Sequence, residues 1–127
     1  MGLILDTNAL SAIGEGEPAA VAAAGRADQI AIPVIVLGEY EFGIARSRHR
    51  SHYERWLGEM LSVSRVLDID EHTAARYAEI RIELKQAGAP IPSNDVWIAA
   101  LCRQHAWPIL TRDRHFDSVR GLERLVW

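Results

Sequence analysis

Two aspartates follow apolar runs in the sequence, at positions where carboxylates commonly do chemistry. Asp6 comes directly after residues 2–5, and Asp113 lies two residues past the run 109–111. Short uninterrupted apolar runs of this kind are typical of strands buried on both faces of a parallel sheet. In open α/β sheets, ligands bind beyond the carboxyl ends of the strands. We therefore expect both carboxylates at one edge of a sheet.

A third aspartate, Asp95, is predicted in the first turn of a helix over residues 93–105. The helix macrodipole favours a negative charge there by about 0.3–1 kcal/mol. Each aspartate taken singly is also explained as a helix cap, which is a common role for this residue. Three carboxylates that converge need a cation to offset their repulsion, and this favours a metal site.

Glu39 is the fourth candidate, and its segment predicts burial. Residues 33–44 are apolar almost all round a helix, so an ionised glutamate among them would be unfavourable unless paired or bound to metal. Glu41 lies about 160° away around the same helix. Periodicity alone leaves the choice between the two glutamates open.

The elements that must position these acids alternate between strands and helices. Strands are predicted at residues 2–5, 29–32, 65–69, 109–111 and 122–127. Helices are predicted at residues 7–13, 18–25, 33–46, 51–63, 71–87 and 93–105, with Thr7, Asp70 and Ser93 as caps. This order predicts a three-layer α/β/α fold around a short, mainly parallel sheet, in a single domain over residues 1–127.

Composition narrows the class of protein. Of the 127 residues, 49% are hydrophobic and 24% charged, which is ordinary for a globular domain. The single cysteine, Cys102, excludes a disulfide framework and a cysteine-rich zinc site, and its apolar neighbours predict a buried thiol. No secretion signal or membrane-length apolar run is present, so we expect a soluble cytoplasmic protein.

The net charge of −3 argues against a surface that binds nucleic acid everywhere. Basic residues nevertheless gather in two stretches, 46–55 and 112–120. These stretches fit a basic rim around an acidic centre, and they fit equally well the solvated faces of helices.

Four motifs in this chain resemble those of the PIN-domain family, and within it the VapC-type toxins of bacterial toxin–antitoxin pairs. The resemblance covers essentially the whole chain, and a glutamate followed four residues later by Gly43 selects Glu39 over Glu41. Gly38 departs from the family, since many members carry Ser or Thr there. The motifs are Asp6-Thr7-Asn8, Glu39 with Gly43, Asp95 with Ile98-Ala99-Ala100, and Thr111-x-Asp113 with Phe116.

The resemblance implies an endoribonuclease that uses Mg²⁺ or Mn²⁺ and leaves 5′-phosphate and 3′-hydroxyl ends. It implies that Asp6 is the shared central metal ligand, that Asp95 and Asp113 complete the site, and that Glu39 binds through a water or orients the nucleophile. Further expected roles are support of the carboxylates by Asn8, Asn94, Thr111 and, as a structural loop residue, Asp117, and RNA contact by Arg112, Arg114 and His115, with Arg46, Arg48 and Arg50 as weaker candidates.

The resemblance also implies a homodimer and a VapB-like antitoxin as partner. The alanine-rich helix at residues 18–24 and the apolar helix that follows Pro33 are candidates for the groove that receives the antitoxin. Internal packing explains their small residues equally well.

Three other interpretations compete with a nuclease. An aspartyl-phosphate phosphatase would want a second aspartate two residues after Asp6, where this chain has Asn8. A receiver domain would want a late lysine, and the only lysine is Lys85, in a predicted helix. A PIN-like binding module without catalysis would be expected to lack one of the acids, and all four are present.

Overall fold

The computed structural model describes residues 1–127 and is built around a five-stranded sheet. Its strand order is β3-β2-β1-β4-β5, and every neighbouring pair runs parallel, as predicted. The strands are β1 (Gly2–Leu5), β2 (Gln29–Pro33), β3 (Arg65–Leu67), β4 (Ile109–Leu110) and β5 (Arg124–Leu125).

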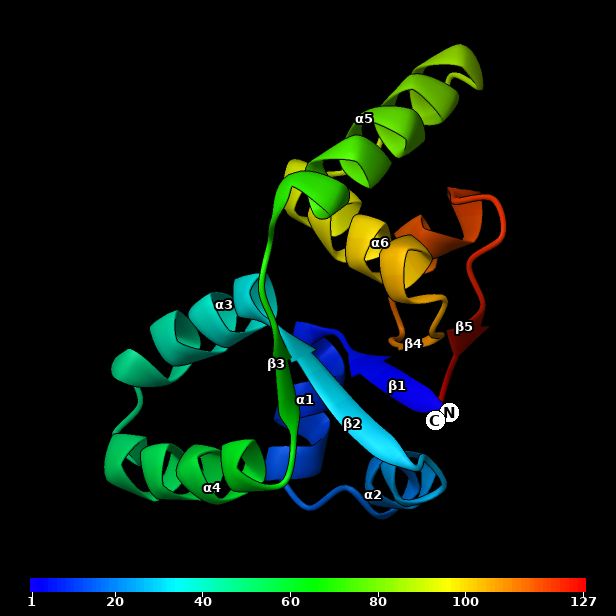
Figure 1. The fold of residues 1–127 in the computed structure, drawn as a ribbon. Coiled ribbons are helices and arrows are strands. Elements are labelled where there is room, and N and C mark those ends of the chain that lie inside the picture. The colour runs from blue at the N-terminus through cyan, green and yellow to red at the C-terminus, as the bar shows by residue number, and fades with distance from the viewer.

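Helices cover both faces of this sheet, which confirms the three-layer arrangement. In Figure 1, α5 and α6 lie on one side of the sheet and α1 and α2 on the other, while α3 and α4 form a pair that extends away from it. None of the helices has the length and apolar character needed to cross a membrane. The helices are α1 (Thr7–Gly14), α2 (Pro18–Gly25), α3 (Val34–Ala45), α4 (Arg50–Ser62), α5 (Glu71–Gln86) and α6 (Ser93–His105), with a 3₁₀ turn η1 (Arg114–Ser118).

The central strand β1 separates two halves of the chain. Its neighbour β2 follows it in sequence, whereas its other neighbour, β4, comes only after α6. The register pairs Leu5 with Leu110, so the residues that follow these two, Asp6 and Thr111, leave the sheet side by side. This reversal of strand order is where open α/β sheets form ligand sites.

The core confirms the sequence reading of the buried strands. All four residues of β1 are buried, and Leu110 and Phe116 are fully buried on the other side of the sheet centre. Cys102 is buried in α6 among the same cluster, as predicted for a packing thiol.

Two predicted helix caps are wrong. Asp6, not Thr7, is the N-cap of α1, because its carboxylate accepts the Thr7 amide hydrogen. Pro92, not Ser93, is the N-cap of α6, and Ser93 becomes the first helical residue with no side-chain capping bond. Asp70 caps α5 in a capping box, as expected.

Several predicted boundaries also differ from the structure. β3 and β5 are shorter than the predicted ranges 65–69 and 122–127, because each is an edge strand with one neighbour to pair with. Residues 114–118, for which the sequence predicts no helix or strand, form the turn η1.

Candidate active site

Asp6 lies at the carboxyl end of β1 and is 6% exposed. Its Oδ1 accepts a hydrogen bond from the Thr7 amide at 2.8 Å, and its Oδ2 accepts one from the Thr111 hydroxyl at 2.7 Å and one from the Asn8 amide at 3.2 Å. Burial raises the pKa of Asp6 above its ordinary value, and the hydrogen bonds from Thr111 and Thr7 offset part of this rise. The buried carboxylate is therefore held in one orientation, but no positively charged side chain is bonded to it.

Thr111 is the centre of the hydrogen-bond network around Asp6. Its hydroxyl donates to Asp6 and accepts from the Asn8 side-chain amide at 3.0 Å and from the Asp113 backbone N–H at 3.0 Å. The hydroxyl is fully buried, so all of its hydrogen-bonding capacity is used inside the protein. One threonine thus ties the orientation of Asp6 to the backbone that carries Asp113.

Asp113 caps the turn η1, and its Oδ1 accepts from the His115 backbone N–H at 2.9 Å. The His115 ring then returns to the acids, with Nδ1 at 3.1 Å from Asp113 Oδ1 and 3.0 Å from Asp95 Oδ2. The hydrogen bond to Asp95 raises the pKa of His115 above its ordinary value. His115, expected as an RNA contact, therefore lies between two of the predicted metal ligands.

Asp95 occupies the first turn of α6, as predicted, and its side chain is 16% exposed. Burial raises the pKa of Asp95, the hydrogen bond with His115 offsets part of the rise, and the negative charges of Asp113 and Glu39 add to it. Asp95 and Glu39 likewise raise the pKa of Asp6. These mutual effects mean that the four acids lie close enough to repel one another.

The prediction that Glu39 is buried is wrong. Only one stripe of α3 is fully buried (Val36, Tyr40 and Ile44), with Ile35 and Leu37 partly buried beside it, because the helix extends away from the sheet. Glu39 is exposed beside this stripe, and Phe42 is 67% exposed. The Thr7 hydroxyl donates to Glu39 Oε1 at 2.8 Å and turns the carboxylate toward Asp6.

The sequence predicts Thr7 only as a helix cap, and its contact with Glu39 is a finding of the structure. The position of Thr7 directly after Asp6 is a signal for this contact, because the first residue of a helix that begins at the site lies close to the end of the same strand. Glu41, the rejected glutamate, is exposed and forms no hydrogen bond or ion pair.

The donor set fits a hard divalent cation. One carboxylate oxygen from Asp95, one from Asp113 and a ring nitrogen of His115 lie within 4.8 Å of one another. Asp6 and Glu39 add further carboxylate oxygens next to this cluster. Carboxylate oxygens are the ligands that Mg²⁺ and Mn²⁺ favour, and a cation would offset the burial and, to a lesser extent, the mutual repulsion that raise the pKa values of Asp6 and Asp95.

Three other predicted residues have different surroundings. Asn94 is exposed and forms no side-chain hydrogen bond with the acids. Asp117 forms a two-pronged ion pair with Arg124, at 2.7 and 3.0 Å, which lowers the pKa of Asp117 and links η1 to β5. Arg112 is paired with Glu17 at 2.9 Å, and its guanidinium lies 4.5 Å from the centre of the Trp127 ring.

The remaining basic candidates form no hydrogen bond with the four acids. Arg114 is exposed at the start of η1 and forms no ion pair. Among the arginines of residues 46–50, Arg50 is paired with Glu54, and Arg46 lies over the exposed Phe42 ring.

Known proteins are similar to this chain in sequence and in fold. The PIN domain family model matches residues 3–122. Ribonuclease VapC5 of Mycobacterium tuberculosis is 30% identical over 96 residues, covering 74% of this chain and 71% of the relative. VapC ribonuclease Y4jK of Sinorhizobium fredii is also 30% identical, covering 95% of this chain and 94% of the relative.

Solved structures agree with these relatives. The crystal structure of VapBC2 from Rickettsia felis bound to a DNA fragment from their promoter matches with a TM-score of 0.87 and 26% identity, over 100% of this chain and 99% of that one. FitAcB from Neisseria gonorrhoeae matches with a TM-score of 0.82 and 28% identity, over 97% and 96% of the two chains. The motifs, the parallel sheet and the cluster of acids at its carboxyl edge have a common explanation: this chain belongs to the PIN-domain family and is of the VapC type.

Proposed function

We propose that this protein is a metal-dependent endoribonuclease and the toxin of a type II toxin–antitoxin pair, acting in the cytoplasm. The observation that carries the proposal is that three acids, Glu39, Asp95 and Asp113, gather near a buried Asp6 whose carboxylate accepts a hydrogen bond from Thr111. The relatives named as ribonucleases support RNA as substrate. Mg²⁺ or Mn²⁺ is the proposed cofactor.

Asp6, Asp95 and Asp113 would hold the metal, and Glu39 would bind it through a water or orient the attacking water. A bound divalent ion would lower the pKa of a water and neutralise charge on the phosphate. Thr111 and Asn8 hold Asp6 Oδ2 in one orientation through their hydrogen bonds, and Thr7 donates a hydrogen bond to Glu39. His115 keeps Asp95 and Asp113 near each other.

The proposed reaction is hydrolysis of a phosphodiester. The water oxygen forms a bond to phosphorus, a nearby carboxylate accepts its proton, and the bond from phosphorus to the 3′ oxygen breaks. The 3′ oxygen takes up a proton from solvent. The products are a 5′-phosphate and a 3′-hydroxyl, so the chemistry requires no protein nucleophile.

Asn8 disfavours the phosphatase alternative. Its amide donates to Asp6 Oδ2, and an amide cannot act there as the acid and base that an aspartyl-phosphate enzyme needs. An inactive binding module is disfavoured because none of the four acids is missing or turned away.

The antitoxin is proposed to dock along α3. The related structures are of toxin–antitoxin complexes, including FitAcB and VapBC2. Cavities of about 340 and 480 Å³ lie beside α3, and both are lined by residues of α3 and α4, with α1 lining the first. The sequence predicts a groove between α2 and α3, whereas these cavities pair α3 with α4 and α1. We retain a homodimer as the proposed assembly.

The test is cleavage of RNA by purified protein freed of any antitoxin. Activity should appear with Mg²⁺ or Mn²⁺, stop with a chelator, and leave 5′-phosphate ends that a phosphate-dependent ligase accepts. An Asp113→Asn variant prepared in the same way controls for a contaminating nuclease. Equal cleavage by that variant, or cleavage in the presence of chelator, would contradict the proposal.

A further inference from the structure

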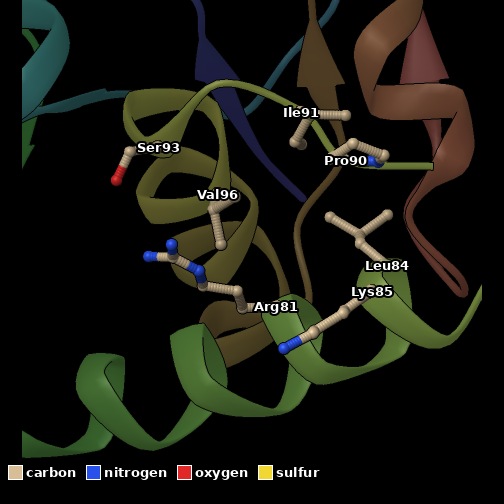
Figure 2. A pocket seen from close by; sticks show the side chains of 7 residues that line it. All are labelled: Arg81, Leu84, Lys85, Pro90, Ile91, Ser93 and Val96. Carbon is tan, nitrogen blue, oxygen red and sulfur yellow. The ribbon is translucent and has the colours of Figure 1, made fainter. Parts of the chain in front are cut away.

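A separate cavity of about 420 Å³ lies between α5 and the start of α6, and none of the four acids lines it. Figure 2 shows its two sides: the charged ends of Arg81 and Lys85 and the hydroxyl of Ser93 point the same way, while Pro90 and Ile91 lie across from them. The buried side chains of Leu84 and Val96 complete the apolar part of the wall. The cavity therefore has a cationic side and an apolar side, and no acidic lining residue.

The two cations of this cavity lack anionic partners. Arg81 and Lys85 are four residues apart on α5, so they lie on one face of the helix and repel each other. Neither forms an ion pair, although Arg76 and Arg103 pair with the glutamates Glu79 and Glu83 of the same helix. An anion in the cavity would relieve this repulsion.

Arg81 is exposed at the cavity, and a hydrogen bond fixes the direction of its guanidinium. Its Nη1 donates to the Tyr77 hydroxyl at 2.5 Å, and that hydroxyl lies 3.2 Å from the Ser93 hydroxyl. The Tyr77 ring in turn stacks on Trp97, with 4.0 Å between ring centres. Tyr77 is thus a positioning residue that joins the cation of α5 to the first turn of α6.

That first turn also connects the cavity to the active site. Ser93, which lines the cavity, comes two residues before Asp95, so the two side chains leave opposite sides of one helical turn. A helix with its side chains is about 10–12 Å across. The two sites therefore lie within reach of neighbouring nucleotides on one strand. Pro92 provides no side-chain cap, which leaves the positive helix end available.

We propose that this cavity binds one nucleotide of the RNA substrate next to the scissile bond. The backbone phosphate would lie on Arg81, Lys85 and the Ser93 hydroxyl. The sugar and base would lie against Pro90 and Ile91. The inference rests on the proposed function. It explains how a protein with a net charge of −3 can bind RNA, since the cavity supplies a local cluster of positive charge. An acidic segment of a protein partner is the competing occupant.

The experiment measures RNA binding by the Asp6→Asn protein, which should not cut its ligand, using a short fluorescein-labelled oligouridylate in Mg²⁺. The tested change is Arg81→Gln with Lys85→Gln. The control is Arg26→Gln, an exposed, unpaired arginine that precedes β2 and so lies at the opposite edge of the sheet. Fluorescence anisotropy is followed across about 50 to 200 mM salt, and thermal unfolding checks that all variants fold alike.

The double variant should bind about tenfold more weakly, and its dependence of log K on log salt should be shallower by about 0.7 for each lost cation contact. The control should match the parent in both. Tyr77→Phe should weaken binding in the parent but have no further effect in the double variant, which a purely structural role would not predict. An unchanged salt slope in the double variant would overturn the inference.

Oligoglutamate and inorganic phosphate serve as competitors to distinguish occupants. If the double variant loses affinity for oligoglutamate but keeps its affinity for RNA, the cavity binds an acidic protein segment and the inference is wrong. Competition by inorganic phosphate at the same concentrations as RNA would reduce the site to a free-phosphate site and would also overturn it. If the wild type cleaves RNA but the salt slope of the double variant is unchanged, the role of the cavity is contradicted and the proposed nuclease is not. If RNA binding depends on the cavity but the wild type does not cleave RNA, the proposed nuclease is contradicted and the role of the cavity is not.

Discussion

The hydroxyl of Thr111 donates to Oδ2 of Asp6 at 2.7 Å, joining residues that are 105 positions apart in the chain. Both side chains are buried, and the same hydroxyl accepts the backbone N–H of Asp113. The orientation of one proposed metal ligand and the path of the backbone to another therefore depend on a single side chain.

Thr111→Val keeps the shape of the side chain but removes this hydroxyl. We expect metal affinity to fall about 10- to 100-fold, because ligands that lose a supporting hydrogen bond are poorly oriented. Calorimetric titration with Mn²⁺ measures the change. Thr73→Val is the control, since Thr73 is equally buried but caps α5 away from the acids. Equal metal affinity in wild type and Thr111→Val would contradict the role.

Asp6→Asn and Asp95→Asn should each reduce RNA cleavage by about a hundredfold or more, because each removes a charge that would hold the metal. Single-turnover cleavage of a labelled RNA gives the rates, and circular dichroism shows whether the fold is kept. A folded variant with near-normal rate would exclude that residue from the site.

Glu39→Gln should slow cleavage about 10- to 100-fold, whereas Glu41→Gln should leave it unchanged. The two glutamates lie on the same helix, yet only Glu39 accepts a hydrogen bond from the Thr7 hydroxyl. Its negative charge also contributes to the raised pKa values of Asp6 and Asp95, after the larger effect of burial. The pair is its own matched control when measured side by side. Full activity in Glu39→Gln would show that the assignment of the glutamate is wrong.

The stabilisation of the protein by Mg²⁺ should shrink as the pH falls from 7.5 toward 5. The pKa values of Asp6 and Asp95 are raised above the ordinary value, mainly by burial, so these carboxylates take up protons at a higher pH than free aspartates. Protons then compete with the metal. Thermal unfolding with and without Mg²⁺ at each pH measures the shift in midpoint, and a shift independent of pH would contradict the prediction.

Without metal, the sign reverses. A carboxyl whose folded-state pKa is raised destabilises the fold when ionised, and this destabilisation is present above the folded pKa and disappears below the unfolded one. The contribution of Asp6 and Asp95 in chelator should therefore favour the folded state as the pH is lowered through the raised pKa values. Asp6→Asn should show a flatter dependence of its unfolding midpoint on pH than the wild type.

Asp117→Asn should leave metal affinity unchanged and lower the unfolding midpoint slightly. The carboxylate of Asp117 is engaged by Arg124, and it lies outside the cluster of Asp95, Asp113 and His115. Asp113→Asn, measured beside it by the same Mn²⁺ titration, should lose affinity. A comparable loss in both variants would make Asp117 a ligand.

The placement of Asp6 and Asp113 at one sheet edge could be predicted because it depends on local patterns. Apolar runs identify buried strands, and alternation with helices fixes their parallel direction, so the residues after two strands must meet. Asp95 could be predicted for the same reason, since a helix start is signalled by its neighbours in sequence.

The exposure of Glu39 could not be predicted in the same way. The apolar composition of residues 33–44 indicates burial only if other elements cover every side, and α3 is fully buried along one stripe only. The link from His115 to Asp95 was also out of reach, because it depends on how η1 packs on α6. Both depend on contacts between distant segments, which periodicity does not encode.

The place of β4 in the sheet also sets when the site can exist during synthesis. In a growing chain from which Thr111 has not yet emerged, the Asp6 carboxylate lacks its hydroxyl partner. One edge of β1 is also unpaired at that stage, because β4 has not yet been added. We expect a fragment that stops before Ile109 to bind no Mn²⁺ in the titration used above, and binding by that fragment would contradict this view. The arrangement of Asp6 with its hydroxyl partner is therefore completed only after the chain segment that carries Thr111 has been made.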